Sequence, residues 1–231
     1  MGYYYSYLPY LLFMLPAIIL GTFAQIRVKS TFSKYSKVRT GRGLTGAYAA
    51  QMVLRQNGVT GVNIERVAGS LTDHYDPKTN TIRLSESVFD SASVAAIGVA
   101  AHEAGHAVQH ATGYAPVKIR TALVPAVNLA SSISVWLVLF GLILNMLGLY
   151  FLGIIAFAIC TLFHLVTLPV ELNASRRAVS TVTDAGYFTD DEIKGAKRVL
   201  TAAALTYVAA LLTSIMQLFY YISLGNNRRR K

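Results

Sequence analysis

The chain has 231 residues, of which 54% are hydrophobic and 14% are charged, and its formal net charge is +10. Its mean hydropathy is +0.45. This composition is typical of an integral membrane protein and excludes an ordinary water-soluble domain. The single cysteine, Cys160, lies inside an apolar segment, so the chain can form no intrachain disulfide.

Four apolar segments are long enough to cross a membrane, since the hydrocarbon core requires about 20 apolar helical residues. They are residues 5–24, 122–145, 147–170 and 201–224. These segments contain no Asp, Glu, Lys or Arg, and their one histidine is His164. The first segment lacks the basic start and the cleavage site of a signal peptide, so we expect it to remain as an anchor. The two middle segments predict a hairpin that turns near residues 145–148.

A basic segment follows the first apolar segment and contains no acidic residue between positions 25 and 43. Its charged residues are Arg27, Lys29, Lys34, Lys37, Arg39 and Arg42. A basic segment beside a membrane span is attracted to anionic lipid headgroups, so the lipid bilayer is the expected partner. Nucleic-acid binding is the alternative, but few aromatic residues interleave these charges, and no nucleic-acid partner is expected.

The polar part of the chain predicts a small α+β region. Residues 44–57 have helical periodicity with Gly58 as a C-cap, and residues 60–68 alternate as in a strand. Residues 73–85 predict a hairpin. Its last piece, residues 81–85, is our candidate for an edge strand on which an extended peptide could pair, and an ordinary exposed strand is the alternative.

An HExxH motif, HEAGH at residues 102–106, lies in an Ala-rich helical segment expected to begin near Ser85 or Ser87 and to end at Gly113. Residues four apart share one helix face, so His102 and His106 can point at one zinc ion. Glu103 beside them could take a proton from a water that the ion activates. A chance motif on a solvated helix is the alternative, but the flanking residues are small or apolar.

Two histidines need a third protein ligand, and a catalytic zinc site then leaves a position for water. His110 lies about 12 Å along a straight helix from His102 and cannot share the ion, so we assign it a supporting role on the helix face. Glu171 is the better candidate, because it opens the polar stretch E-x-x-A-S and is expected to start a helix after Pro169. Ser175 would then support a ligand by a hydrogen bond. The alternative for Glu171 is to place negative charge at a helix N-terminus.

Two motifs, HEAGHAVQH at residues 102–110 and LPVELNASRRA at residues 168–178, resemble those of the YugP-like neutral zinc metallopeptidases. These are membrane-embedded HExxH proteases, distantly similar to the HtpX-type proteases, and the resemblance covers nearly the whole chain. It implies that His102, His106 and Glu171 bind one Zn²⁺ per chain and that Glu103 is the general base. HtpX-type proteins usually have Asp at the position of Ser175, so the role of Ser175 stays open.

The order of the motifs restricts the membrane topology. If His106 and Glu171 meet at one ion, an even number of crossings must separate them, and residues 122–170 are long enough for two. The site is therefore expected near a bilayer surface. Beyond it lie Arg176 and Arg177, one of which could pair with a carboxylate or help to hold an oxyanion, with Arg177 as the candidate, while the other faces lipid phosphates. Structural salt bridges are the alternative for both. Residues 189–192, Thr-Asp-Asp-Glu, predict a capping box that opens a helix into the last apolar segment.

Together these features predict a mainly α integral membrane protein with about four transmembrane helices and a membrane-apposed, zincin-like α+β catalytic region. The expected parts are an anchor (residues 1–25), the catalytic region (26–121), a transmembrane hairpin (122–170), the third-ligand helix with its connection (171–200), and the last helix with a basic tail (201–231).

The expected function is zinc-dependent hydrolysis of peptide bonds in peptide or membrane-protein substrates. The alternatives are a non-catalytic, metal-stabilised scaffold or client-binding protein, and a metal-dependent hydrolase of a non-peptide substrate. Basic residues flank the catalytic side of the spans, which predicts a multi-pass protein of the plasma membrane with its active site in the cytoplasm. Four full crossings would place the basic tail, residues 228–231, outside the cell, which conflicts with the same rule. A last segment that does not fully cross would remove the conflict.

A cysteine that replaces Ser36 tests this orientation in a Cys160-free background. Because the basic segment around Ser36 is expected in the cytoplasm, an impermeant thiol reagent should label it only after the cells are permeabilised. Labelling of intact cells would contradict the cytoplasmic orientation.

Overall fold

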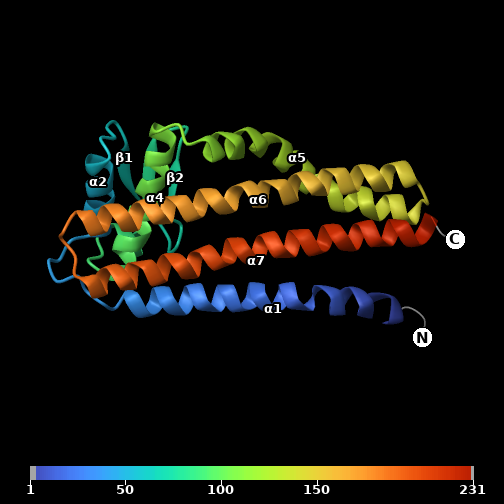
Figure 1. Ribbon diagram of the computed structural model, residues 1–231, viewed down its shortest axis with the longest axis horizontal. Coiled ribbons are helices and arrows are strands. Elements are labelled where there is room, and N and C mark those ends of the chain that lie inside the picture. The colour runs from blue at the N-terminus through green and yellow to red at the C-terminus, as the bar shows by residue number, and fades with distance from the viewer. Residues whose placement is uncertain (1–3, 230–231) are drawn as a thin grey trace. The chain divides into compact units, whose positions relative to one another are not determined.

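A computed structural model describes residues 4–229 of the chain (Figure 1). Within them, four helices are long and apolar enough to cross a membrane. These are α1 (Tyr4–Tyr35), α5 (Ala115–Ile143), α6 (Leu147–Asp184) and α7 (Asp190–Arg229). With a small sheet in addition, this confirms the predicted mainly α membrane protein that carries an α+β region.

The chain divides into two compact units. The first, here called the apolar unit, contains Met1–Ala24, Ile119–Leu168 and Thr206–Lys231. The second, here called the α+β unit, contains Gln25–Lys118 and Pro169–Leu205. Both the HExxH motif and Glu171 belong to the α+β unit. The five parts predicted from the sequence remain a prediction.

In the apolar unit, α5 and α6 form the expected hairpin (Figure 1), which turns at Asn145 with a φ of 54°. Glycines let the two helix backbones approach closely, since a Cβ atom on Gly141 would lie 2.5 Å from the Tyr150 nitrogen. A 2.8 Å hydrogen bond between the hydroxyls of Thr161 and Ser214 connects α6 to α7.

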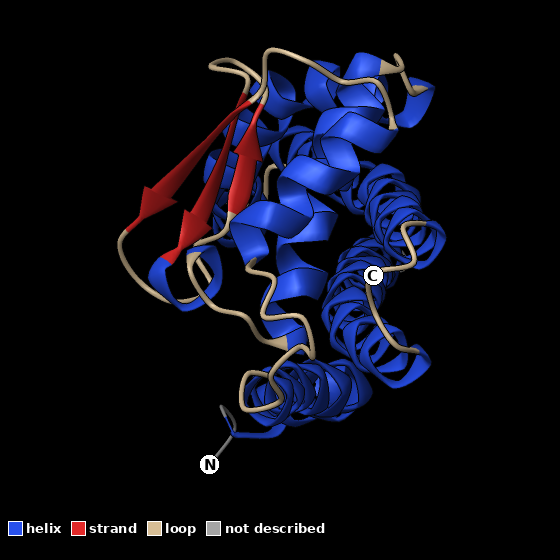
Figure 2. Cartoon of the chain, turned by 90° about the vertical axis from the view of Figure 1, so that its left-hand side faces the viewer, coloured by secondary structure: helices blue, strands red, loops and turns tan. Residues whose placement is uncertain are grey.

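The α+β unit contains three strands and three shorter helices. They are α2 (Gly46–Gln56), β1 (Asn63–Val67), β2 (His74–Asp76), β3 (Thr81–Ser85), α3 (Glu86–Phe89) and α4 (Val94–Ala111). The three strands lie side by side (Figure 2). Their order is β1-β3-β2, with β1 parallel and β2 antiparallel to β3. Buried side chains of α2, β3 and α4 form the core of this unit, among them Val53, Ile82, Leu84, Ile97 and Val108.

The prediction that residues 81–85 form an edge strand was wrong, because β3 is the central strand. Its apolar side chains, Ile82 and Leu84, are fully buried, and its polar side chains are paired as well. Arg83 forms an ion pair with Asp76, and Ser85 donates to Asp73 through both its amide and its hydroxyl. The polar residues that alternate with Ile82 and Leu84 along β3 therefore do not form a solvent-exposed face.

The prediction of one long helix from Ser85 or Ser87 was also wrong, because α3 ends at Phe89 and α4 begins at Val94. The carbonyls of Ser91 and Ala92 accept hydrogen bonds from the amides of Gly46 and Thr40, respectively, so this segment leaves the helical path. Ser93 caps α4 by accepting a hydrogen bond from the Ala96 amide.

Glu171 does not start a helix, contrary to the prediction, because α6 continues through Pro169. Proline lacks the amide that would bond to the preceding turn, but membrane helices tolerate this loss when neighbouring groups compensate. The third apolar segment and the segment that carries Glu171 are therefore one helix. The predicted capping box is confirmed, since the Thr189 amide donates to Glu192 at 2.7 Å and the Glu192 amide donates to the Thr189 hydroxyl.

The close approach of α4 and α6 can be tested at Gly105. A Cβ atom there would lie 2.6 Å from the Ala174 carbonyl oxygen, so Gly105→Ala should destabilise the protein by about 1–3 kcal/mol. Thermal unfolding of the detergent-solubilised chain measures this effect.

Gly98→Ala on the same helix is the matched control, because its Cβ atom would meet Ala196 at an ordinary 3.4 Å. We expect that variant to unfold at or slightly above the wild-type temperature. Equal unfolding temperatures for both variants would contradict a tight helix crossing at Gly105.

Candidate metal centre

Helices α4 and α6 bring together the three residues that the sequence singled out as metal ligands. The His102 Nε2 atom lies 3.2 Å from Glu171 Oε2, and the His106 Nε2 atom lies 3.4 Å from the same oxygen. The three candidate ligand atoms all lie within 4.8 Å of one another. Their convergence requires the α4–α6 crossing, because Glu171 and the two histidines come from different helices.

These distances fit a zinc ion. Two ligands at about 2.0–2.1 Å from a tetrahedral zinc are about 3.3–3.4 Å apart, and the two nitrogen–oxygen separations lie at this value. The imidazole rings of His102 and His106 stand at 83° to one another with centroids 4.7 Å apart, so both can direct an edge at one point.

The outer nitrogen of each imidazole also has a partner. His102 Nδ1 lies 3.0 Å from the Ser175 hydroxyl, and His106 Nδ1 lies 3.0 Å from Gln109 Oε1. An amide oxygen only accepts hydrogen bonds, so His106 Nδ1 must carry the proton. In a neutral ring the lone pair of Nε2 then faces the Glu171 carboxylate, so either a proton on Nε2 or a metal ion must lie between them. The arrangement therefore suits a bound metal ion as well as a proton.

The pKa of His106 agrees with such a cation site. Burial lowers this pKa, but the hydrogen bond to Glu171 and the negative charges of Glu103 and Glu171 outweigh burial and raise it above its ordinary value. The carboxylates thus stabilise a positive charge at the imidazole, and a divalent ion can replace the proton there.

Glu103 is the buried acid of the HExxH motif, with 9% of its surface exposed. Among the described residues none donates a hydrogen bond to its carboxylate. Its carboxylate oxygens are not among the buried polar atoms that lack a partner, so they remain accessible to a water or a substrate group. Its negative charge also lies close enough to raise the pKa of His106. Glu103 is therefore placed to act on a molecule bound at the three-residue group.

The other sequence candidates lie around this group rather than in it. His110 is not a member, and its ring lies 5.4 Å from that of Tyr75 on β2. Arg177 donates from Nε to the Asn173 side-chain oxygen at 2.9 Å, and its guanidinium lies 5.8 Å from the Tyr114 ring. It forms no ion pair with a carboxylate in residues 4–229, so the predicted pairing is not seen, and the role at an oxyanion stays a prediction.

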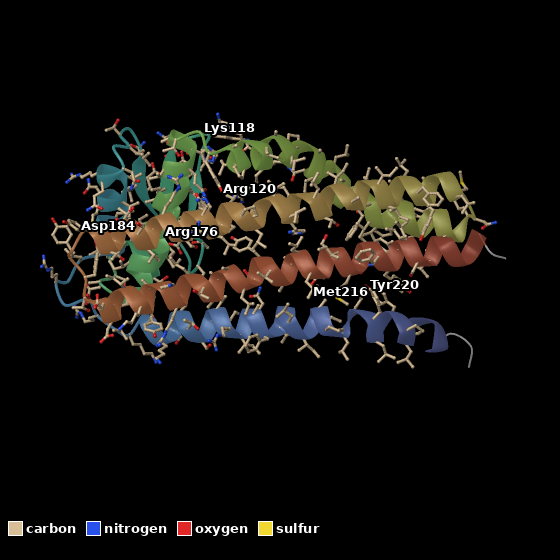
Figure 3. All side chains as sticks on the ribbon, in the orientation of Figure 1. Lys118, Arg120, Arg176, Asp184, Met216 and Tyr220 are labelled. Carbon is tan, nitrogen blue, oxygen red and sulfur yellow. The ribbon has the colours of Figure 1, made fainter. Side chains whose placement is uncertain are left out.

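Arg176 lies on the exposed side of α6 (Figure 3). It contributes to an open cavity of about 520 Å³ in the α+β unit, which Gln56, Asn57 and Asp184 also line. None of the three candidate metal ligands lines this cavity.

Sequence reasoning missed Gln109 and Asn173. Gln109 is fully buried, and its Nε2 atom donates to the Val170 carbonyl at 2.8 Å and to the Asn173 side-chain oxygen at 3.0 Å. Its position could have indicated a role, because Gln109 lies three residues after His106, on the same face of a helix whose remaining residues outside the HExxH motif and His110 are small or apolar.

Comparison with known proteins gives a family for the chain. Residues 10–226 match a family described as "Putative neutral zinc metallopeptidase". The chain belongs to this family. It is also similar to a curated protein of Bacillus subtilis (strain 168), "Putative membrane protease YugP", with 46% identity over 213 residues that cover 92% of this chain and 95% of the relative. No solved structure matches the chain.

Family membership confirms the resemblance inferred from the two motifs. It gives the two histidines and Glu171 a chemical context, since the family is described by zinc and the three side chains fit a zinc ion. With four helices of membrane-spanning length within residues 4–229, the chain is a multi-pass membrane protein of a zinc metallopeptidase family.

Proposed function

We propose that the chain is a membrane-bound zinc endopeptidase with one metal site per chain, held by His102, His106 and Glu171. The observation that carries the proposal is the convergence of these three side chains next to Glu103, whose carboxylate accepts no hydrogen bond from the described residues and is free to accept one from a water. Two nitrogen ligands and one oxygen ligand leave a fourth position at zinc for water or substrate, as in catalytic zinc sites.

Zinc, when bound, supplies Lewis-acid chemistry that polarises the scissile carbonyl and makes a water more acidic. The protein supplies the proton transfers. The Glu103 carboxylate accepts a proton from the attacking water, whose oxygen forms a bond to the carbonyl carbon. Glu103 then delivers that proton to the leaving amine nitrogen as the carbon–nitrogen bond breaks.

Ser175 supports this site through His102. Its hydroxyl lies 3.0 Å from Nδ1, where a hydrogen bond orients the ring and leaves Nε2 for the metal. A hydroxyl can perform this task as an Asp carboxylate would, because both accept a hydrogen bond from Nδ1.

We propose peptide segments of membrane proteins, or unfolded polypeptides near a bilayer, as the substrates. Glu171 follows Leu168, the last α6 residue of the apolar unit, by three residues, so the site is covalently tied to a membrane-spanning segment. Strand β2 is an outer strand of the sheet, and its Tyr75 contacts His110 of α4. An extended peptide paired with β2 would therefore run beside the helix that carries the HExxH motif.

The charges of the α+β unit support a cytoplasmic active site in the plasma membrane. The six basic residues between positions 25 and 43 are all exposed, and Lys118 and Arg176 add to them (Figure 3). Positive charge of this kind is retained on the cytoplasmic side of bacterial membranes.

A non-catalytic, metal-stabilised scaffold is the competing function. A scaffold would need the three ligands but would have no use for Glu103, which forms neither a ligand contact nor a hydrogen bond with the described residues. A carboxylate beside the three ligands that has no structural partner is better explained by a catalytic role.

Glu103→Gln separates the two functions. The change keeps the size of the side chain but removes its ability to accept a proton, so cleavage of an unfolded protein substrate should fall by roughly 10²–10⁴-fold. Zinc content, measured by atomic emission on the purified chain, should stay near the wild-type level.

His102→Ala is the companion variant and should lose both zinc and activity. Equal cleavage by wild type and Glu103→Gln would contradict the proposed mechanism. Full zinc occupancy without cleavage of any peptide by the wild type would favour the scaffold.

A further inference from the structure

Gln109 is a fully buried amide that contacts both helices of the candidate metal centre. It lies on α4, three residues after His106, and 0% of its surface is exposed. Its Oε1 atom lies 3.0 Å from His106 Nδ1, and its Nε2 atom bonds to the Val170 carbonyl and the Asn173 side chain of α6. One side chain thus joins a candidate zinc ligand to the residue that precedes Glu171.

The directions of these hydrogen bonds follow from the chemistry of the outer partners. The Val170 carbonyl can only accept, so the Gln109 atom that faces it must be the NH₂ group. Arg177 Nε can only donate, so the Asn173 atom that faces it must be the carbonyl oxygen, which then also accepts from Gln109. Both ends therefore fix the same orientation of the Gln109 amide.

That orientation determines which ring nitrogen of His106 carries the hydrogen in the neutral form. With its NH₂ group directed at α6, Gln109 presents its oxygen to His106 Nδ1, which must then carry the hydrogen. In the neutral ring, Nε2 holds the lone pair and faces the point shared with His102 and Glu171. A ring flip would place a carbon atom against the amide oxygen and lose this bond.

We propose that Gln109 is a positioning residue for the zinc site, which fixes the His106 tautomer and holds α6 so that Glu171 reaches the ion. This inference rests on the zinc site proposed above. All three polar groups of the amide, two N–H donors and one carbonyl oxygen, have partners, so a substitution that removes the amide affects His106 and α6 at once.

The support for His102 differs in kind. Ser175 can donate or accept, and its hydroxyl rotates, so it does not dictate which His102 nitrogen carries the hydrogen. The tautomer of His106 is therefore fixed by its partner, whereas that of His102 is not. Ser175→Ala should weaken zinc binding less than the removal of the Gln109 amide.

The test compares Gln109→Leu with Gln51→Leu in the purified full-length chain. Gln51 is exposed on α2, so it provides the same chemical change away from the site. Zinc affinity is measured by competition with a chelator, and ligand geometry by the visible absorption of the cobalt(II)-substituted protein. Folding of each metal-free variant is checked by circular dichroism.

Gln109→Leu should bind zinc roughly 10–100-fold more weakly and change the cobalt spectrum, while Gln51→Leu should match the wild type. Wild-type zinc affinity and cobalt spectrum in a folded Gln109→Leu protein would overturn the proposal. If the leucine variant does not fold, Gln109→Asn replaces it, because the shorter amide stays polar but cannot span from His106 to Val170. Undiminished zinc affinity in that variant would overturn the proposal equally.

Failure of the zinc site itself would be distinguishable. A wild-type chain that binds no zinc would overturn the proposed function together with the role of Gln109. A wild-type chain that binds zinc and cleaves peptides, with both Gln109 variants unaltered, would overturn only the role of Gln109.

Discussion

Two helix backbones meet where Gly105 of α4 lies against Ala174 of α6, with no room for a side chain at position 105. The crossing lies between His102 and His106 on one helix and next to Glu171 and Ser175 on the other. A wider separation would leave the Glu171 carboxylate beyond the reach of the imidazoles, because its side chain has only three rotatable bonds. The candidate metal centre, the contact between Ser175 and His102, and the Gln109 network all depend on this approach.

A polar centre between closely packed helices requires that every buried polar group has a partner. In the α+β unit, Gln109, Asn173 and Arg177 satisfy one another in a single chain of hydrogen bonds that ends at His106. Glu103 stands apart, since it has no such partner among the described residues. Glu103 is therefore free to bind a water or a substrate group, as the proposed catalytic role requires.

Features that depend on local periodicity could be predicted from the sequence. The spacing of His102 and His106 gives one helix face, and the even number of spans before Glu171 returns the chain to the histidines. The Thr189–Glu192 capping box is another local pattern, and it is present as predicted.

Features that depend on tertiary partners were not predictable in the same way. Strand β3 became central because β1 and β2 pair with its two edges, and α4 begins only at Val94 because the amides of Thr40 and Gly46 bond to the carbonyls of Ala92 and Ser91. Gln109 was missed because a glutamine has no fixed partner until α6 is packed against α4.

The coordination of zinc in the purified chain tests the metal centre most directly. Zinc K-edge X-ray absorption should show only nitrogen and oxygen ligands at about 2.0–2.2 Å, with the outer-shell scattering of two imidazoles. Glu171→Ala should lose most of the bound zinc, because two histidines alone hold the ion weakly. Sulfur scattering, the absence of imidazole scattering, or undiminished zinc in Glu171→Ala would contradict a site made by His102, His106 and Glu171.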